Sequence, residues 1–343
     1  MPLSLSAWTF FDLGHTDIRT DYDPQQDQWD IRIDRGEQGS GTRFFSGDEA
    51  ALVANPPSKL IIPGSLPASF AFLGDEGDAV WILPQGSTAG VVFMGLNQFG
   101  VPAGTFDGGG EGLITLELVD FEGPGDFFLY SVQGGQATVH MDTRSGSPPF
   151  GARGMGAGGH AHFNWAFTQE GIYFLTFQPS GTRVGDGVLT TGDPVTFAFL
   201  IDPEPFDFWR FEHFGFQVHD PMAADEADPD ADGAPNLLEY AMGGNPLYPD
   251  QKREPVVEPR EFADELYLTL TYWQPPERED IRYEIQASSD LLSWKTLDIE
   301  GMGLSSSGAG NADGDGVPLI TVRDEEPLGN FTRRFMRLKV SHQ

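Results

Sequence analysis

The sequence predicts an all-β protein, and two observations lead to this prediction. Short segments that alternate apolar and polar residues recur along most of the 343-residue chain, with the period of two that is typical of strands. Examples are QWDIRI (28–33), GLITLELVDF (112–121) and GIYFLTF (171–177). The chain also contains 43 glycines and 26 prolines, which favour turns between short strands over long helices. With 39% hydrophobic residues, it can bury a core.

Three regions of the chain differ in composition. Residues 1–202 contain alternating segments at a spacing typical of an antiparallel β-sandwich, and they show no helical pattern. Residues 203–260 form a linker that is first aromatic and then acidic, in which we expect a short helix. Residues 261–343 return to strand-like segments, from ELYLTLTYWQ (265–274) to RRFMRLKVS (333–341). We therefore expect two β domains joined by a partly helical linker.

The acidic composition limits the classes of partner. Lys and Arg total 20 against 52 Asp and Glu, which gives a formal net charge of −32. Such a surface repels nucleic acid and anionic membranes and attracts divalent cations, although acidity that only keeps a protein soluble would look the same. The absence of cysteine excludes disulfides, thiolate zinc sites and cysteine nucleophiles. No stretch reaches the roughly 18–20 apolar residues of a membrane helix. We expect neither nucleic-acid binding nor membrane insertion.

Two closely spaced histidines indicate a metal site. His160 and His162 lie in GGHAHFNWAF, and on one continuous strand they and Asn164 would face the same side, while Phe163 and Trp165 would enter the core. Two imidazoles roughly 6–7 Å apart by strand rise can share a metal ion when a further ligand arrives from elsewhere.

Three residues could supply that further ligand. His15 and Asp17 lie two residues apart in LGHTDI, and His140 lies in TVHMDT. The same spacings also fit histidines that are hydrogen-bonded beneath a loop, so both interpretations stand. The metal-site interpretation has His15, Asp17, His160 and His162 as ligands, with His140 and Asn164 as further candidates.

A calcium-binding loop is predicted within the linker. Residues 228–239 match the pattern D-x-[DN]-x-[DN]-G-x5-E, with Gly233 at the position where the chain must turn sharply. Calcium prefers six to eight oxygen ligands, which this spacing supplies. The expected ligands are Asp228, Asp230, Asp232, Ala234 through its carbonyl, Asn236 and Glu239. The alternative is a solvated acidic linker that binds nothing.

A series of motifs runs through about residues 10–202, in the order LGHTDIRTDYDP, WDIRID, FAFLGDEGDAVWILPQ, FMGLNQFGVPAGTF, LVDFEGPGDFFLY and GGHAHFNWAFTQEGIYFLTFQPSGT. This series resembles the choice-of-anchor M domain of bacterial surface proteins, and it is similar to the actinobacterial surface-anchored repeat with its NWAFT-x-x-G-x-Y core. Members are surface-anchored or secreted, and some are associated with zinc- or manganese-type transport systems. The resemblance implies an extracellular or cell-surface location and a metal at the histidines. Residues 1–14 do not form a signal peptide, so we expect the signal or anchor to lie outside this sequence.

The linker and the C-terminal region carry a second resemblance. The segment NLLEYAMGGNP and the calcium pattern before it resemble a single dockerin-like or thrombospondin-type loop. The motifs YEIQASSDLLSWKTL, ITVRDEEP and RRFMRLKV resemble the small, Ig- or fibronectin-like β-sandwich that ends many exported proteins of Verrucomicrobia-like bacteria. In such proteins this sandwich is an accessory module. The acidic segment NADGDG (311–316) lacks the spaced glutamate of a calcium loop, and we interpret it as a turn.

The sequence contains none of the common catalytic motifs. It has no G-x-S-x-G, no H-E-x-x-H and no phosphate-binding glycine loop, and nothing singles out one pair of its many carboxylates as a glycosidase acid and base. We therefore expect a non-catalytic exported protein that binds structural Ca²⁺ and a transition metal such as Zn²⁺, with a metal-transport system as a candidate partner. The alternative is an adhesion or carbohydrate-binding module, in which exposed Trp8, Trp29 or Trp81 stacks on a surface polysaccharide and calcium is purely structural.

Overall fold

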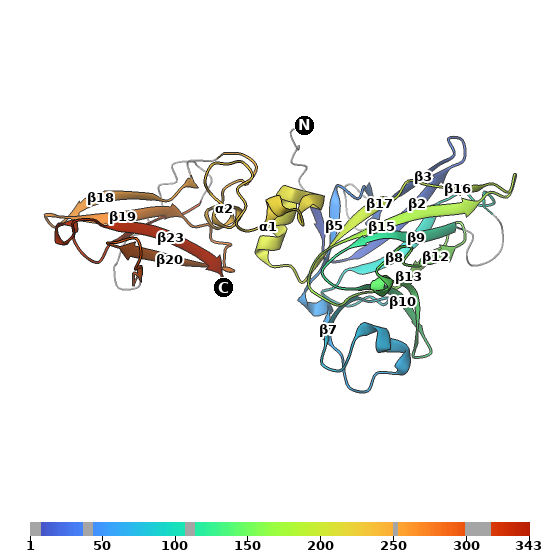
Figure 1. The fold of residues 1–343 in the computed structure, drawn as a ribbon. Coiled ribbons are helices and arrows are strands. Elements are labelled where there is room, and N and C mark those ends of the chain that lie inside the picture. The colour runs from blue at the N-terminus through green and yellow to red at the C-terminus, as the bar shows by residue number, and fades with distance from the viewer. Residues whose placement is uncertain (1–7, 37–43, 107–113, 250–252, 299–316) are drawn as a thin grey trace. The chain divides into compact units, whose positions relative to one another are not determined.

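The chain forms two compact units, residues 1–203 and 204–343 (Figure 1). The computed structural model describes residues 8–36, 44–106, 114–249, 253–298 and 317–343. Strands make up most of the ordered elements and the helices are short, which confirms the all-β fold class. Residues 204–260 of the predicted linker belong to the second unit. The predicted turn at 311–316 lies outside the described residues.

The described strands of the first unit form three sheets. The largest has the order β1–β5–β17–β15–β9–β12, with β16 beside β15. Its strands are β1 (Thr9–Phe11), β5 (Ala50–Ala54), β9 (Ile114–Glu122), β12 (Ala152–Met155), β15 (Gly171–Thr182), β16 (Leu189–Thr191) and β17 (Val195–Ile201). A second has the order β11–β10–β14–β7–β6, formed by β6 (Lys59–Ile61), β7 (Ala79–Leu83), β10 (Phe127–Gln133), β11 (Gln136–Asp142) and β14 (Asn164–Phe167).

The third sheet has the order β13–β8–β2–β3–β4 and carries the candidate metal ligands. Its strands are β2 (His15–Asp23), β3 (Gln28–Asp34), β4 (Phe44–Phe45), β8 (Phe93–Gly100) and β13 (His160–His162). The prediction of a purely antiparallel sandwich is wrong in one respect, because β2 pairs with β8 in parallel, as β5 does with β1 and β17. Parallel neighbours need a long crossover, and the chain from β2 to β8 is long enough to provide it.

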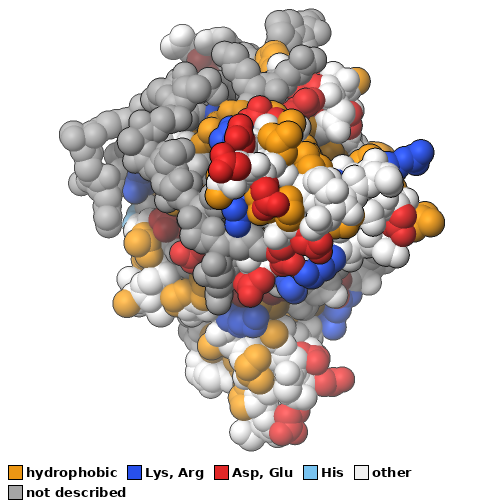
Figure 2. Space-filling view, turned by 90° about the vertical axis from the view of Figure 1, so that its left-hand side faces the viewer, with side chains coloured by type: hydrophobic (Ala, Val, Ile, Leu, Met, Phe, Trp, Pro, Cys, Tyr) orange, Lys and Arg blue, Asp and Glu red, His pale blue; other side chains and the backbone are white. Residues whose placement is uncertain are grey.

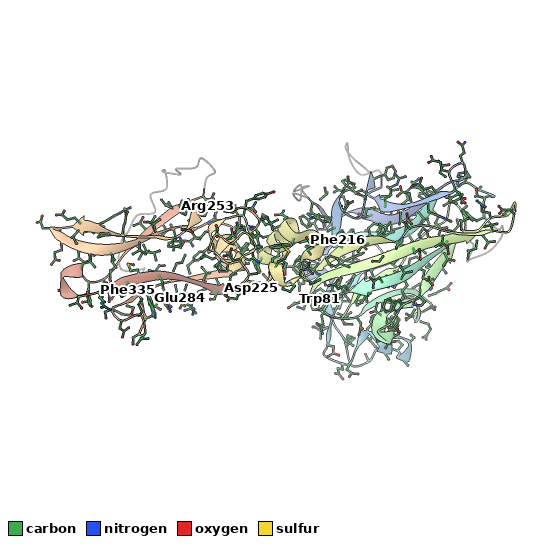
Figure 3. All side chains as sticks on the ribbon, turned by 45° about the horizontal axis from the view of Figure 1, so that its top comes forward. Trp81, Phe216, Asp225, Arg253, Glu284 and Phe335 are labelled. Atoms are coloured by element: carbon green, nitrogen blue, oxygen red, sulfur yellow. The ribbon has the colours of Figure 1, made fainter. Side chains whose placement is uncertain are left out.

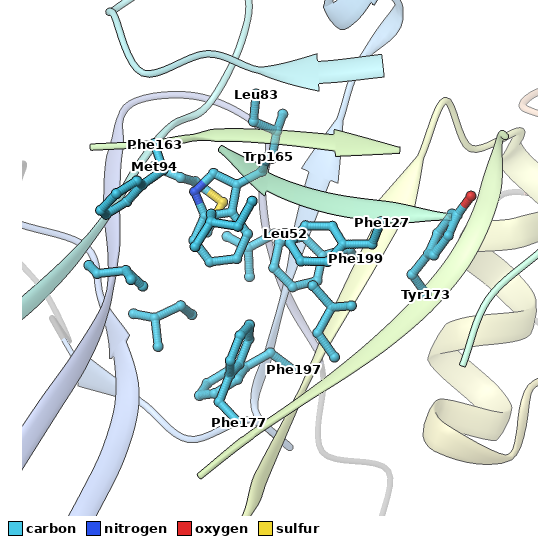
Figure 4. Close-up of a cluster of buried hydrophobic side chains, with 14 of the residues drawn as sticks. Leu52, Leu83, Met94, Phe127, Phe163, Trp165, Tyr173, Phe177, Phe197 and Phe199 are labelled. Carbon is cyan, nitrogen blue, oxygen red and sulfur yellow. The ribbon is translucent and has the colours of Figure 1, made fainter. Parts of the chain in front are cut away.

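All three sheets contribute to one apolar core. Trp165 from β14 is fully buried and stacks on Phe199 from β17, with 5.7 Å between the ring centroids. Met94 from β8 belongs to the same cluster (Figure 4). Aromatic side chains bury large areas, and such pairs add roughly 0.5–1.5 kcal/mol each beyond that burial. This shared core fixes β8 and its neighbours, so it holds the sheet that carries the histidines.

The second unit combines two small sheets with two helices. Its described strands are β18 (Val256–Phe262), β19 (Glu265–Trp273) and β22 (Leu319–Arg323) in one sheet, and β20 (Ile281–Ser288), β21 (Lys295–Thr296) and β23 (Phe335–His342) in the other. Glu284 and Phe335, labelled in Figure 3, lie on the antiparallel pair β20 and β23. Both sheets contribute to a core that also includes Met242 at the end of α2 (Asn236–Met242). The other helix, α1 (Pro205–Phe214), precedes α2 in the chain and begins with a capping box between Glu204 and Asp207.

The remaining ordered elements are short 3-10 helices, and the surface is mixed in charge. The described 3-10 helices are η1 (Pro56–Ser58), η2 (Ala68–Leu73), η3 (Thr143–Ser145), η4 (Gly215–Gln217), η5 (Pro221–Ala223) and η7 (Leu328–Asn330). On the face drawn in Figure 2, acidic side chains lie among hydrophobic and basic ones. Among the residues that the structure describes, no helix has the length and apolar character that crossing a membrane requires.

Candidate metal centre

Three adjacent strands bring the predicted metal ligands together. His15 and Asp17 lie on β2, His160 and His162 lie on β13, and β8 runs between these two strands (Figure 1). The register places Gly95 of β8 directly between Asp17 and His162. Residues two apart on a strand share a face, so all four side chains project from the same side of the sheet. We call His15, Asp17, His160 and His162 the histidine cluster.

The ligand atoms of the histidine cluster converge. One such atom from each of the four residues lies within 4.8 Å of the others. The Nε2 atoms of His15 and His160 both lie 3.3 Å from the same oxygen, Asp17 Oδ1. Asp17 is only 2% exposed, whereas His160 and His15 are 30% and 26% exposed at their side chains. The cluster therefore has a buried carboxylate at its base and imidazoles toward solvent.

This geometry fits a transition-metal ion. Zinc–ligand bonds of about 2.0–2.2 Å place neighbouring ligand atoms of a tetrahedral site roughly 3.3–3.6 Å apart, and the two nitrogen–oxygen distances at Asp17 Oδ1 are 3.3 Å. The contact from His15 to this oxygen lacks the geometry of a hydrogen bond, so His15 Nε2 is buried with no hydrogen-bond partner. Imidazole nitrogens suit zinc, copper, iron or nickel, whereas calcium and magnesium take oxygen ligands. The histidine cluster could hold a transition metal.

His162 is held in the protonation form that a metal ligand needs. Its Nδ1 lies 2.9 Å from the carbonyl oxygen of Met94. A carbonyl can only accept, so Nδ1 donates the proton and the lone pair of Nε2 is left for an ion. The ring also stacks on Phe93 with 3.8 Å between centroids. Burial lowers the pKa of His162, and this effect outweighs the Met94 carbonyl and Asp17, which both raise it, so the neutral form that binds metal is favoured.

Two residues of β8 shape the cluster, and the sequence analysis missed both. Gly95 has no side chain, and an added Cβ would lie 2.5 Å from Asp17 Oδ1 and 3.0 Å from His162 Nδ1. Asn97 is fully buried and donates from Nδ2 to Asp17 Oδ2 at 3.0 Å. A glycine inside a strand often marks the close approach of a ligand or another chain segment, and this signal was present in FMGLNQF.

Two further candidates lie outside the cluster. His140 is on β11 in another sheet, where its Nε2 lies 3.0 Å from Ser131 Oγ. Asn164 does not continue the strand of His160 and His162, because the chain changes sheets at Phe163 and Asn164 begins β14. Its side chain accepts from the backbone N–H of Gln85 at 3.0 Å instead. The structure therefore corrects the prediction that these two residues join the metal site.

Comparisons with known proteins do not assign the chain. No protein-family model matches it. A search of curated proteins gives no match either. The resemblance carried by the sequence motifs stays a prediction.

The predicted calcium loop brings three aspartates together. Asp228, Asp230 and Asp232 offer carboxylate oxygens that all lie within 4.8 Å of one another. Gly233 takes a φ of +101°, which suits the sharp turn expected at this position. Backbone N–H groups of the loop point inward, since Gly233 donates to Asp228 at 3.0 Å. Burial and the two neighbouring carboxylates raise the pKa of Asp230, as a site that gathers negative charge would.

The remaining predicted calcium ligands have other surroundings. Asn236 is fully buried, and its Nδ2 donates to the carbonyls of Met222 and Ala224 at 2.9 and 2.7 Å. It therefore ties the loop to the segment that enters it, while its Oδ1 is buried with no hydrogen-bond partner. Ala234 donates its N–H to Asp232. Glu239 is 3% exposed on α2, and its carboxylate is not within the group that the three aspartates form.

Of the three tryptophans predicted as sugar platforms, Trp8 is half-buried, and Trp29 and Trp81 are buried. Trp29 is 7% exposed and donates to Thr190, and Trp81 is 4% exposed and donates to Asp202 (Figure 3). The prediction that Trp29 and Trp81 are exposed is wrong, because both indole rings pack inside the first unit. Trp81 does contribute to the lining of an open cleft of about 810 Å³, which also includes Asp75 and Arg144 and lies apart from the histidine cluster.

Proposed function

We propose that this chain is a non-catalytic exported or cell-surface protein whose N-terminal unit binds a zinc-like transition metal through His15, Asp17, His160 and His162. The observation that carries the proposal is the convergence of three imidazoles on one buried carboxylate, from strands that lie far apart in sequence. A buried carboxylate among histidines needs a compensating positive charge, which a divalent ion supplies.

The surroundings support metal binding more than simple packing. The Met94 carbonyl sets the tautomer of His162, and Asn97 holds Asp17, as the outer partners of metal ligands commonly do. Four protein ligands are typical of a structural or storage zinc site, since catalytic sites keep a position for water. This count favours metal capture or delivery over hydrolysis, in line with the transport systems that the sequence resemblance suggests.

We further propose that the second unit binds calcium at Asp228, Asp230 and Asp232. The three carboxylates repel one another without a cation, so calcium should stiffen the segment that leads into α2. An affinity of roughly 10⁻⁴–10⁻³ M would suffice outside the cell, where such modules operate. Calcium then has a structural role.

A zinc titration tests the main proposal. Purified chain without a histidine tag is titrated with Zn²⁺ against a chromophoric chelator, alongside His15→Ala, Asp17→Ala and the control His140→Ala. The proposal predicts one tight site that both cluster variants weaken, whereas His140→Ala binds as the wild type does because His140 lies on another sheet. Equal affinity in all four proteins would refute it. For the carbohydrate-binding alternative, Trp29 and Trp81 offer almost no exposed ring, whereas Trp8 is half-buried.

A further inference from the structure

Strand β8 supplies no ligand to the histidine cluster, yet it contacts most of the ligands. It lies between β2 and β13, so each of its outward-facing residues has a ligand strand on both sides. Phe93 stacks on His162, and the Met94 carbonyl accepts from the same ring. Gly95 leaves the space in which Asp17 and His162 approach each other. Phe99 packs against His160 with 5.4 Å between the ring centroids, and Asn97 hydrogen-bonds to the carboxylate of Asp17.

We infer that Asn97 is a positioning residue that holds Asp17 as a one-oxygen ligand and thereby favours a four-coordinate ion such as Zn²⁺ or Co²⁺. This inference rests on the proposed metal-binding function. Its basis is that Oδ2 of Asp17 already accepts from Asn97 Nδ2 at 3.0 Å, whereas Oδ1 lies 3.3 Å from Nε2 of both His15 and His160. His160 Nε2 is also 3.2 Å from Oδ2, so the contact with Asn97 is what distinguishes the two oxygens.

The hydrogen bond between Asn97 and Asp17 is strengthened by the burial of both side chains. Asn97 is 0% exposed and Asp17 is 2% exposed, so water does not compete for the carboxylate. The other end of Asn97 is also held, because its Oδ1 accepts from the backbone N–H of Phe99 at 3.4 Å. The χ2 torsion of an aspartate is soft, so a carboxylate with no fixed partner can turn both oxygens toward an ion. Asn97 opposes that rotation.

The consequence is metal selectivity. A one-oxygen Asp17 and three imidazoles give four ligands, which zinc and cobalt accept in a tetrahedral arrangement. Manganese, magnesium and calcium prefer more oxygen ligands and higher coordination numbers. Removing Asn97 should weaken zinc more than manganese, because the freed carboxylate could offer both oxygens to an ion.

The test is a double-variant cycle on the whole chain, with Zn²⁺, Mn²⁺ and Co²⁺ as probes. Asn97→Ala, Asp17→Ala and the double variant are compared, with Asn164→Ala as the matched control. Asn164 is also a buried asparagine with side-chain hydrogen bonds, but it lies in another sheet. If Asn97→Ala does not fold, Asn97→Ser replaces it, since the serine hydroxyl can still accept from Phe99.

We expect Asn97→Ala to weaken zinc binding about 10- to 100-fold in the wild-type background and less than about threefold when Asp17 is already alanine. The Co²⁺-loaded variant should show weaker visible absorption than the wild type, as higher coordination gives. Asn164→Ala should change neither readout. Zinc binding that needs Asp17 but tolerates Asn97→Ala would overturn this inference and leave the metal-binding function standing. A wild-type chain that binds no metal would overturn both.

Discussion

Replacing Gly95 with alanine should abolish tight metal binding while leaving the fold in place. An ideal Cβ at this position would lie 2.5 Å from Asp17 Oδ1, 2.9 Å from the carbonyl oxygen of Ala161 and 3.0 Å from His162 Nδ1. Carbon and oxygen atoms normally approach to about 3.3 Å, so the carboxylate must retreat by roughly 0.8 Å. Metal–ligand distances tolerate only about 0.2 Å. The alanine variant therefore loses Asp17 as a ligand.

The expected magnitude follows from that loss. Changes around metal ligands cost about 10- to 100-fold in affinity, and the direct displacement of a ligand should reach or exceed the upper value. A 100-fold loss removes about 2.7 kcal/mol of the stability that saturating zinc confers. The crowding itself should cost about 1–3 kcal/mol in the metal-free protein.

Calorimetric zinc titration and thermal unfolding with and without zinc measure both effects. The matched control is Gly181→Ala, whose added Cβ would lie 2.7 Å from the Phe106 ring, away from the cluster. It should lose stability but keep zinc affinity. A folded Gly95→Ala variant that binds zinc within about threefold of the wild type would refute the reasoning.

Three further predictions concern the second unit. Asp230→Ala should weaken calcium binding at least tenfold in a calorimetric titration, because it removes the central carboxylate of the loop, and unchanged affinity would contradict the calcium site. Burial lowers the pKa of His213 from 6.5 to about 4, so the unfolded chain takes up a proton first and stability falls as pH drops from 6.5 to 4. Between pH 7 and pH 4.5, His213→Gln should therefore lose up to about 3 kcal/mol less unfolding free energy than the wild type, as measured by urea unfolding at both pH values. The same pH dependence in both proteins would contradict this prediction. Arg334→Met should cost about 3–5 kcal/mol, because it leaves the carboxylate of Asp324 buried at 0% exposure without its partner. Arg282→Met should cost about 1 kcal/mol at most, because the Arg282 side chain is 66% exposed, and equal losses in the two variants would contradict this difference.

The sequence predicts what depends on local spacing. Alternation predicts the strands, and the spacing of two places His160 with His162 and His15 with Asp17 on common faces. The same local reasoning brings the aspartates of the calcium loop together, because their spacing and one glycine define the turn.

Long-range pairing is what local patterns do not specify. Nothing in the spacing of residues shows that β8 lies between β2 and β13, or that β2 and β8 are parallel. The chain also changes sheets at Phe163, since Trp165 fills a core position in β14, and this separates Asn164 from the histidines. Gly95 and Asn97 acquire their roles only through that arrangement.

Metal content by mass spectrometry tests the central claim most directly. Wild-type chain without a histidine tag is dialysed against calcium with trace zinc, manganese and copper, next to His160→Ala/His162→Ala and His140→Ala. The account predicts about one transition-metal ion per chain in the wild type and in His140→Ala, and none in the double variant, with calcium unchanged. A wild type that holds only calcium, or a double variant that keeps its transition metal, would contradict it.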